Sequence, residues 1–380
     1  MLGIVDPLDD AKLRAMIEKH SSGEDVSFRE YVRARKIELG KYVTNHKLIY
    51  LDTRYWIILR EALLGRQPNH LSVRLLDYLR LHARKNEIIC PISESVLIEV
   101  LKQEDLRTRR KTAELIDELS LGVALASEPD RIGTEFAHFF YSRDGRSSIY
   151  PLKSLIWSKM NYIFGDMYPI NTGLIPDKER VMQKVCYDWM WEGSLTEIVD
   201  ILGDEQPPLS DFKELASSLN EVMAKFSDKI QNFQQVCAKE IEGGLRVYMP
   251  KVRAILKDIY GHGDSVMPIN SDAEQKEAER QLLSFFVQAF QKTGIDSLSP
   301  TLFIHALCHA SVRWDKSRKF KGNDFYDFHH SAAAVPYCDV FLTESPLRTL
   351  LQANHLKINQ YFNCKIISSI SEAVDYLEKE

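Results

Sequence analysis

The sequence lacks the features that mark several common classes of protein. Its six cysteines are scattered and form no Cys-x-x-Cys pair, which indicates reduced thiols in a cytosolic protein. The first residues have neither the basic head nor the apolar core of a secretory signal. No apolar run reaches the roughly 20 residues that are needed to cross a membrane. We therefore expect a soluble, cytoplasmic protein that does not bind a membrane.

An excess of positive charge is also absent. Lys and Arg number 49 against 54 Asp and Glu, and the formal net charge is -5. Any contact with nucleic acid therefore has to come from local basic patches. What the chain does have is 44% hydrophobic residues over 380 positions, enough for one large core or two ordinary ones.

Short apolar segments alternate with helical patterns in two parts of the chain. These segments predict strands at residues 48–52, 88–90, 122–126, 340–342 and 365–368. Such alternation implies an α/β fold with a parallel five-stranded sheet and right-handed crossovers. The alternation stops between residues 144 and 299, a stretch that we interpret as a large helical insertion. Residues 1–47 are predicted to be an N-terminal helical extension, which leaves 48–143 and 300–380 as the two halves of the α/β domain.

Local signals mark the ends of individual helices. Ser27 and Glu30 have the spacing of a capping box, which predicts a helix that runs to about residue 44. The run Gly322-Asn323-Asp324 predicts the start of another helix, and Pro336 predicts its end.

Acidic residues fall at related places in the predicted fold. Asp52 ends the first strand, Glu99 lies on the helix after the second, and Asp324 or Asp327 opens the helix before the fourth. Taken alone, each acid is explained as a helix cap or a solvated surface group. In an open parallel sheet, however, these positions converge at the carboxyl edge, where several carboxylates repel one another unless a cation lies among them. Oxygen ligands favour Mg²⁺ or Mn²⁺.

The order of these motifs resembles that of a PIN domain, a metal-dependent nuclease fold found in many RNA-cleaving toxins and RNA-processing enzymes. The resemblance rests on Leu48-Ile49-Tyr50-Leu51-Asp52-Thr53, on the segment from Pro91 to Glu99, and on the segment from Asp327 to Thr343-Glu344-Ser345. It covers roughly 48–143 and 300–380, and it implies a three-layer fold.

The resemblance also implies roles for individual residues. Asp52 would be the first metal carboxylate, Glu99 the second, and Asp327, or Asp324 a turn earlier, the third. The family's usual last acid falls at Ser345 in this chain, and Glu344, one residue earlier, is the expected substitute. The implied activity is hydrolysis of phosphodiester bonds, with RNA favoured over DNA.

A basic segment precedes the acidic helix and is the predicted nucleic-acid contact. Its five bases are Arg313, Lys316, Arg318, Lys319 and Lys321, and Trp314 or Phe320 could stack on a base. The alternative is a solvated loop. Arg107, Arg109, Arg110 and Lys111 form a second candidate patch.

Histidines close to these motifs allow more than one interpretation. His305 and His309 are spaced i, i+4 on one predicted helix, as in some zinc sites, but no Glu follows His305 as in a His-Glu-x-x-His motif. We interpret them as a core or surface pair. His329 or His330 could contact a scissile phosphate, or could orient a metal ligand through a hydrogen bond.

The sequence thus predicts a metal-dependent endonuclease with Mg²⁺ or Mn²⁺ as cofactor and RNA as its main partner. The alternative is a catalytically impaired PIN-like scaffold that uses the insertion as its partner surface, and the irregular fourth acid favours this alternative. A protein regulator or a second copy of the chain is the further partner that the insertion suggests. An aspartyl-phosphate phosphatase is disfavoured, because Asp52-Thr53-Arg54 lacks the required Asp-x-Asp pair.

Overall fold

The computed structural model describes residues 10–23, 26–66, 69–143, 149–205, 211–226, 232–260, 277, 280–286, 288 and 299–379. The chain divides into two compact units. Unit 1 comprises Met1–Ser127, Lys153–Leu209 and Ile370–Glu380, and unit 2 comprises Glu128–Leu152 and Ser210–Ser369. The predicted insertion therefore contributes to both units. Its residues 206–210, 227–231 and most of 261–298 lie outside the described residues.

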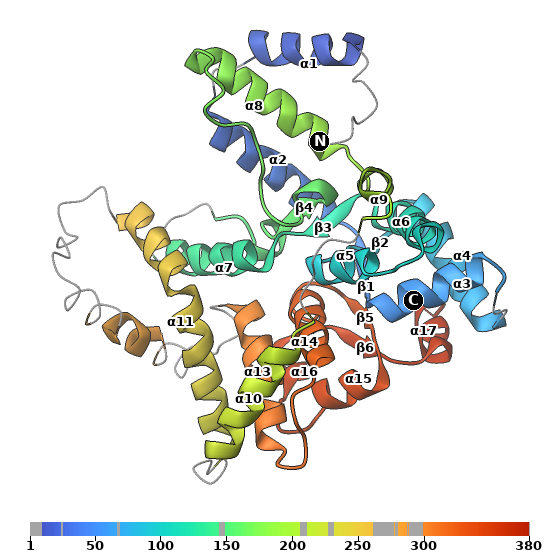
Figure 1. The fold of residues 1–380 in the computed structure, drawn as a ribbon, viewed down its shortest axis with the longest axis vertical. Helices are drawn as coiled ribbons and strands as arrows, with labels where there is room; N and C mark the ends of the chain where they lie inside the picture. The colour runs from blue at the N-terminus through green and yellow to red at the C-terminus, as the bar shows by residue number, and fades with distance from the viewer. Residues whose placement is uncertain are drawn as a thin grey trace. The chain divides into compact units, whose positions relative to one another are not determined.

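Unit 1 is mostly helical, with four short strands (Figure 1). Its elements are α1 (Asp10–Ser22), α2 (Phe28–Val43), β1 (Lys47–Leu51), α3 (Thr53–Leu63), α4 (His70–Arg84), β2 (Ile88–Ile89), α5 (Glu94–Leu101), α6 (Leu106–Ser120), β3 (Val123–Leu125), β4 (Trp157–Lys159), the 3₁₀ turn η2 (Met160–Tyr162), α8 (Pro176–Trp191), α9 (Leu195–Leu202) and α17 (Ile370–Leu377). A further 3₁₀ turn, η1 (Leu152–Ser154), lies at the boundary with unit 2.

The strands of unit 1 pair in two ways. β1 runs parallel to β2, with Lys47 opposite Ile88. β3 runs antiparallel to β4, with Ala124 opposite Ser158, and a single parallel bridge joins Ala124 to Ile92. Leu48 to Leu51 are all buried, as expected for a strand covered on both faces.

Unit 2 contains long helices and one pair of strands. Its elements are α7 (Glu128–Arg143), α10 (Lys213–Phe226), α11 (Phe233–Tyr260), α13 (Pro300–Trp314), α14 (Gly322–Ala334), β5 (Val340–Leu342), α15 (Ser345–Leu351), α16 (Ile358–Tyr361) and β6 (Lys365–Ile367). β5 runs parallel to β6, with Phe341 opposite Ile366.

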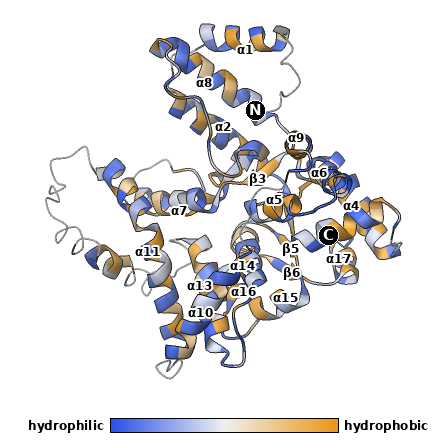
Figure 2. Cartoon of the chain, viewed as in Figure 1, coloured by the Kyte–Doolittle hydropathy of each residue, from blue (hydrophilic) through white to orange (hydrophobic). Residues whose placement is uncertain are grey.

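The core of unit 2 forms around α13, which packs against α7, α11 and α14. One cluster of buried apolar side chains joins α7, α11 and α13, and it includes Phe136, Leu245 and Leu302. Figure 2 shows that α11 carries hydrophobic and hydrophilic residues side by side, as an amphipathic helix does. Gly322 opens α14 where a Cβ atom would lie 2.5 Å from the Asp211 carbonyl oxygen, so only glycine fits without a shift.

Many local predictions are confirmed. The capping box of Ser27 and Glu30 forms at the start of α2. β5 occupies residues 340–342 as predicted, and α13 begins at Pro300. α14 begins at Gly322, and Pro336 follows its last turn. The chain is α/β with mostly helices, and four of its strands pair in parallel.

The predicted five-stranded parallel sheet is not confirmed. The third predicted strand, β3, pairs antiparallel with β4, a strand that lies inside the stretch interpreted as wholly helical. β4 escaped prediction because it is only three residues long and reads Trp-Ser-Lys, which shows no alternation long enough to indicate a strand. It forms because β3 offers it an edge.

Candidate functional sites

The first two predicted metal carboxylates both belong to unit 1, and one hydrogen bond links their surroundings. Asp52 follows β1 and caps α3, because its side chain accepts a hydrogen bond of 3.1 Å from the Tyr55 backbone N–H. The next residue, Thr53, donates from Oγ1 to Glu99 Oε2 over 2.6 Å. The start of α3 therefore holds the carboxylate of Glu99 beside the residue that follows Asp52.

A second contact fixes α5 against the end of β1. The hydroxyl groups of Tyr50 and Ser93 lie 2.6 Å apart, and both residues are buried. Since Ser93 directly precedes α5, this contact places the helix that carries Glu99 against the strand that leads to Asp52.

The remaining predicted acids belong to unit 2 and differ in their surroundings. Asp324 is buried, forms an ion pair of 2.9 Å with Arg318, and accepts a hydrogen bond of 2.8 Å from the Lys321 backbone N–H. Asp327 lies one turn further along α14 and is partly exposed. Arg318 already balances the charge of Asp324, and the choice between Asp324 and Asp327 as third metal ligand stays a prediction.

Glu344 is exposed and directly precedes α15, at the carboxyl end of β5. Asp52 and Glu99 belong to one unit, and Asp327 and Glu344 to the other. The convergence of these four carboxylates on one cation therefore stays a prediction.

Two of the five bases in the predicted nucleic-acid segment are paired with acidic residues. Arg313 forms an ion pair of 2.5 Å with Glu240 of α11, and Arg318 is paired with Asp324. The other three bases, Lys316, Lys319 and Lys321, are exposed.

The two aromatic residues of this segment differ as well. Phe320 is buried and stacks on Phe325, so its predicted role in stacking on a base is wrong. Trp314 is partly exposed and meets Phe233 edge-on at 6.1 Å.

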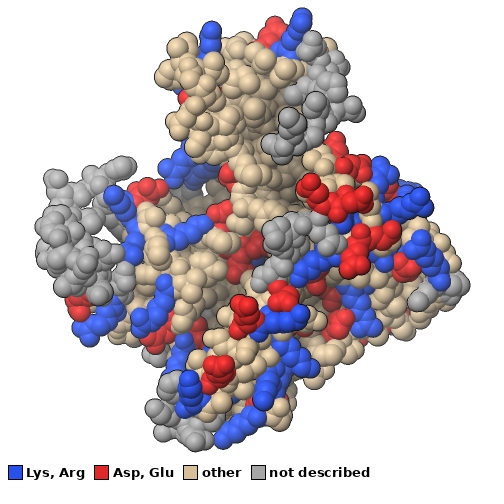
Figure 3. Space-filling model, viewed as in Figure 1, with Lys and Arg blue, Asp and Glu red and all other residues tan. Residues whose placement is uncertain are grey.

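In the second candidate patch, on α6, three of the four bases contact other groups of unit 1. Arg109 is fully buried and donates to the backbone carbonyls of Gly203 and Glu205. Arg110 pairs with Asp200, and Lys111 pairs with Glu114 of the same helix. On the face drawn in Figure 3, basic and acidic side chains are interspersed.

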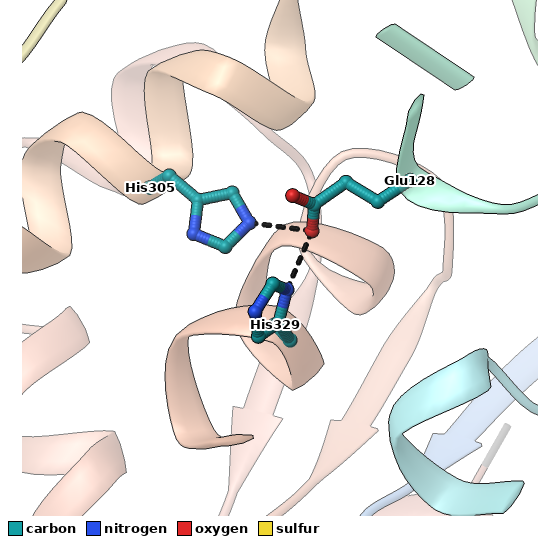
Figure 4. Close-up of side chains that lie close together, drawn as sticks. All are labelled: Glu128, His305 and His329. Carbon is teal, nitrogen blue, oxygen red and sulfur yellow. Dashed lines mark hydrogen bonds and ion pairs between the residues drawn. The ribbon is translucent and has the colours of Figure 1, made fainter. Parts of the chain in front are cut away.

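A group that the sequence analysis did not assemble lies in unit 2. Glu128, His305 and His329 come from α7, α13 and α14, and their side chains point toward one another (Figure 4). Glu128 Oε2 lies 2.7 Å from His305 Nε2 and 2.6 Å from His329 Nδ1. Within the described part of the chain, these three offer ligand atoms that all lie within 4.8 Å of one another.

Further contacts orient the carboxylate of this group. The Tyr248 hydroxyl donates to Glu128 Oε1 over 3.0 Å, and an Arg131 nitrogen lies 4.0 Å from Oε2. Burial acts to raise the pKa of Glu128, but the charges and hydrogen bonds of His305 and His329 outweigh it and hold that pKa well below its usual range.

The sequence contains a pattern that could have indicated Glu128 as a site residue. Glu128 follows β3 as Asp52 follows β1, so the rule that acids gather where strands end applies to both. The sequence spacing pairs His305 with His309 and His329 with His330, whereas the structure brings His305 and His329 together at Glu128. His309 does not join His305 at a site, because it packs among Phe320, Phe325 and Phe328, and burial lowers its pKa to about 3.

Comparison with family models, with curated proteins and with solved structures found no match for this chain. Within the described residues, no helix combines the length and the apolar character that a membrane crossing requires.

Proposed function

We propose that this protein is a metal-dependent endonuclease that hydrolyses phosphodiester bonds, with RNA as its preferred substrate. The observation that supports the proposal most directly is the hydrogen bond between Thr53 and Glu99. It fixes the carboxylate of Glu99, the second predicted metal ligand, beside Thr53. Thr53 directly follows Asp52, the first predicted metal ligand. A cation site needs such convergence, because carboxylates that approach one another are stabilised by a shared positive ion.

The proposed site would hold Mg²⁺ or Mn²⁺ through Asp52, Glu99 and Asp327, with Glu344 in the place of the family's last acid. When bound, the ion would activate the attacking water and stabilise the leaving oxygen of the phosphodiester. The protein's own contribution is to orient the ligands: Thr53 holds the carboxylate of Glu99, and the cap on α3 holds that of Asp52. Lys316, Lys319 and Lys321 would attract the nucleic-acid backbone.

Cleavage of single-stranded RNA by the purified protein, with Mg²⁺ or Mn²⁺ added, tests this proposal. We expect EDTA to stop cleavage, and we expect Asp52→Asn, Glu99→Gln and Asp327→Asn each to do the same, because each removes a metal ligand. Asp77→Asn and Glu104→Gln are the matched controls, since both change exposed acids of unit 1. Failure of every form to cut RNA or DNA with either metal would contradict the nuclease.

One observation favours the second candidate, a scaffold protein whose PIN-like core has lost activity. The segment between η2 and α8 exposes large apolar side chains, among them Phe164 at 58%, Ile170 at 65% and Ile175 at 61% exposure. Clusters of this kind often mark surfaces that bind other proteins. The scaffold is supported if the chain lacks nuclease activity and if Asp52→Asn leaves its binding to a protein partner unchanged. The double variant Phe164→Ser, Ile170→Ser should then abolish that binding.

A further inference from the structure

We propose that Glu128, His305 and His329 bind a divalent transition-metal ion of the zinc class. This site shares no residue with the Mg²⁺ or Mn²⁺ site proposed above, and it consists wholly of residues of unit 2. Two imidazole nitrogens and one carboxylate oxygen are the donor set of several zinc enzymes, whereas Mg²⁺ and Ca²⁺ prefer oxygen ligands alone.

The distances between the donor atoms suit such an ion after a small movement. In a tetrahedral zinc site with bonds of about 2.0–2.1 Å, neighbouring ligand atoms lie about 3.4 Å apart. In the structure the two imidazole nitrogens lie 2.7 and 2.6 Å from Glu128 Oε2. Insertion of the ion therefore requires each of these pairs to separate by less than about 1 Å. The protons that the nitrogens now share with the carboxylate would leave as the ion binds.

Charge in the surrounding core also favours a cation. Two carboxylates, Glu128 and Glu135, are buried near the buried guanidinium of Arg131. Burial raises the pKa of Glu135 overall and outweighs the hydrogen bonds that it accepts from Ser299, Thr301 and Tyr337, which act to lower that pKa. A cation at Glu128 would add positive charge beside these buried carboxylates.

The protein holds the ligands in place before any ion binds. Tyr248 donates to Glu128 Oε1, which leaves Oε2 to face the two imidazoles. The helices that carry Glu128, Tyr248 and His305 share one buried apolar cluster, and α14, which carries His329, packs on α13. Ligands fixed by a rigid core lose little freedom when they bind an ion.

Two of the three proposed ligands are partly exposed to solvent. The side chain of His305 is 14% exposed and that of His329 is 30% exposed, while the carboxylate lies deeper, at 9%. Three protein ligands with solvent access on one side are typical of zinc sites whose fourth position holds water, unlike closed structural sites with four protein ligands.

Binding of zinc to the full-length protein, after treatment with a chelator, tests the proposal. We expect calorimetry with Zn²⁺ and metal analysis of the dialysed protein to show about one ion per chain. We expect a rise in melting temperature with added Zn²⁺, because the ion binds the folded state. His305→Ala and His329→Ala should each abolish binding. His355→Ala is the matched control, since it removes an exposed histidine of the same unit.

A milder variant keeps the test decisive if a ligand variant fails to fold. Tyr248→Phe removes only the hydroxyl that orients Glu128, and we expect it to weaken zinc affinity by about 10–100-fold. Equal zinc binding by Tyr248→Phe and the original protein would overturn the proposal. A loss of zinc binding in His355→Ala as large as that in the ligand variants would also overturn it, and so would the absence of zinc binding in the original protein. Asp52→Asn should retain zinc, so failure of the nuclease proposal and failure of the zinc site give different results.

Discussion

His309 could bind a metal or transfer a proton, but its side chain packs among apolar residues. Its ring packs against three phenylalanines, and burial lowers its pKa to about 3. Glu240 Oε2 lies 3.9 Å from His309 Nδ1, but Glu240 is also paired with Arg313, and the charges of Arg313 and of the histidines of the proposed zinc site act to lower the pKa of His309. His309 therefore stays neutral in the folded protein over the physiological range of pH.

This neutral state makes the stability of unit 2 depend on pH. Below about pH 6.5 the unfolded chain protonates His309 while the folded chain does not, so the free energy of unfolding should fall as the pH falls toward about 3. The limiting slope is about 1.4 kcal/mol per pH unit. Urea denaturation of the metal-free protein at pH 7, 5.5 and 4.5 measures it. His309→Gln should remove this part of the pH dependence and His355→Gln should not, and identical slopes in all three proteins would contradict the prediction.

At the scale of a single element, the start of α3 combines a structural and a proposed catalytic role in Asp52. Its carboxylate caps the helix by accepting from Tyr55, and asparagine caps a helix about as well as aspartate does. We therefore expect Asp52→Asn to leave the metal-free stability within about 0.5 kcal/mol of the original, whereas Asp52→Ala should cost about 1 kcal/mol. Thermal or chemical denaturation with and without Mn²⁺ measures both effects.

The same experiment separates the cap from the metal ligand. Asp52→Asn should also lose stabilisation by Mn²⁺, because the amide is a weaker ligand than the carboxylate. Asn69→Ala is the control, since Asn69 caps α4 in the same way, and it should cost stability but keep the response to Mn²⁺. A large loss of stability in metal-free Asp52→Asn would instead mean that the negative charge itself holds the fold.

Single elements also show where prediction from the sequence succeeds. The start of α2, the start of α13 and the strand β5 depend on residues that are neighbours in the chain, such as Ser27 with Glu30, so the sequence alone specifies them. β4 depends on an edge that β3 provides, and nothing in its own three residues reveals that partner. The candidate site follows the same division. Asp52 and Glu99 could be proposed from their places after strands, but Glu128, His305 and His329 meet only through the packing of three helices.

At the scale of the whole molecule, the net charge of -5 means that the proposed nucleic-acid binding would depend on few residues. Since Arg313 and Arg318 are paired with acids, we assign the contact to Lys316, Lys319 and Lys321. Replacing all three lysines with glutamine should weaken RNA binding and reduce the slope of log affinity against log salt by about 2, while the cleavage rate at saturating RNA stays unchanged.

Fluorescence anisotropy across a series of salt concentrations gives that slope. The matched control replaces Lys12, Lys85 and Lys102 of unit 1 with glutamine, which changes the net charge by the same amount. If both triple variants reduce the slope equally, the RNA responds to total charge and the contact is not located at the segment.

The order of the segments in unit 1 has a consequence for how the protein is made. The helix α17 packs on α4 and buries Ala373, Val374 and Leu377, and Glu378, which directly follows α17, pairs with Arg74. Chains fold from the N-terminus as the ribosome releases them. The face of α4 that α17 covers therefore stays uncovered until residues 370–377 have been synthesised, and by then all of unit 2 has been synthesised. If synthesis stopped before residue 370, the oldest part of unit 1 would be the part left incomplete.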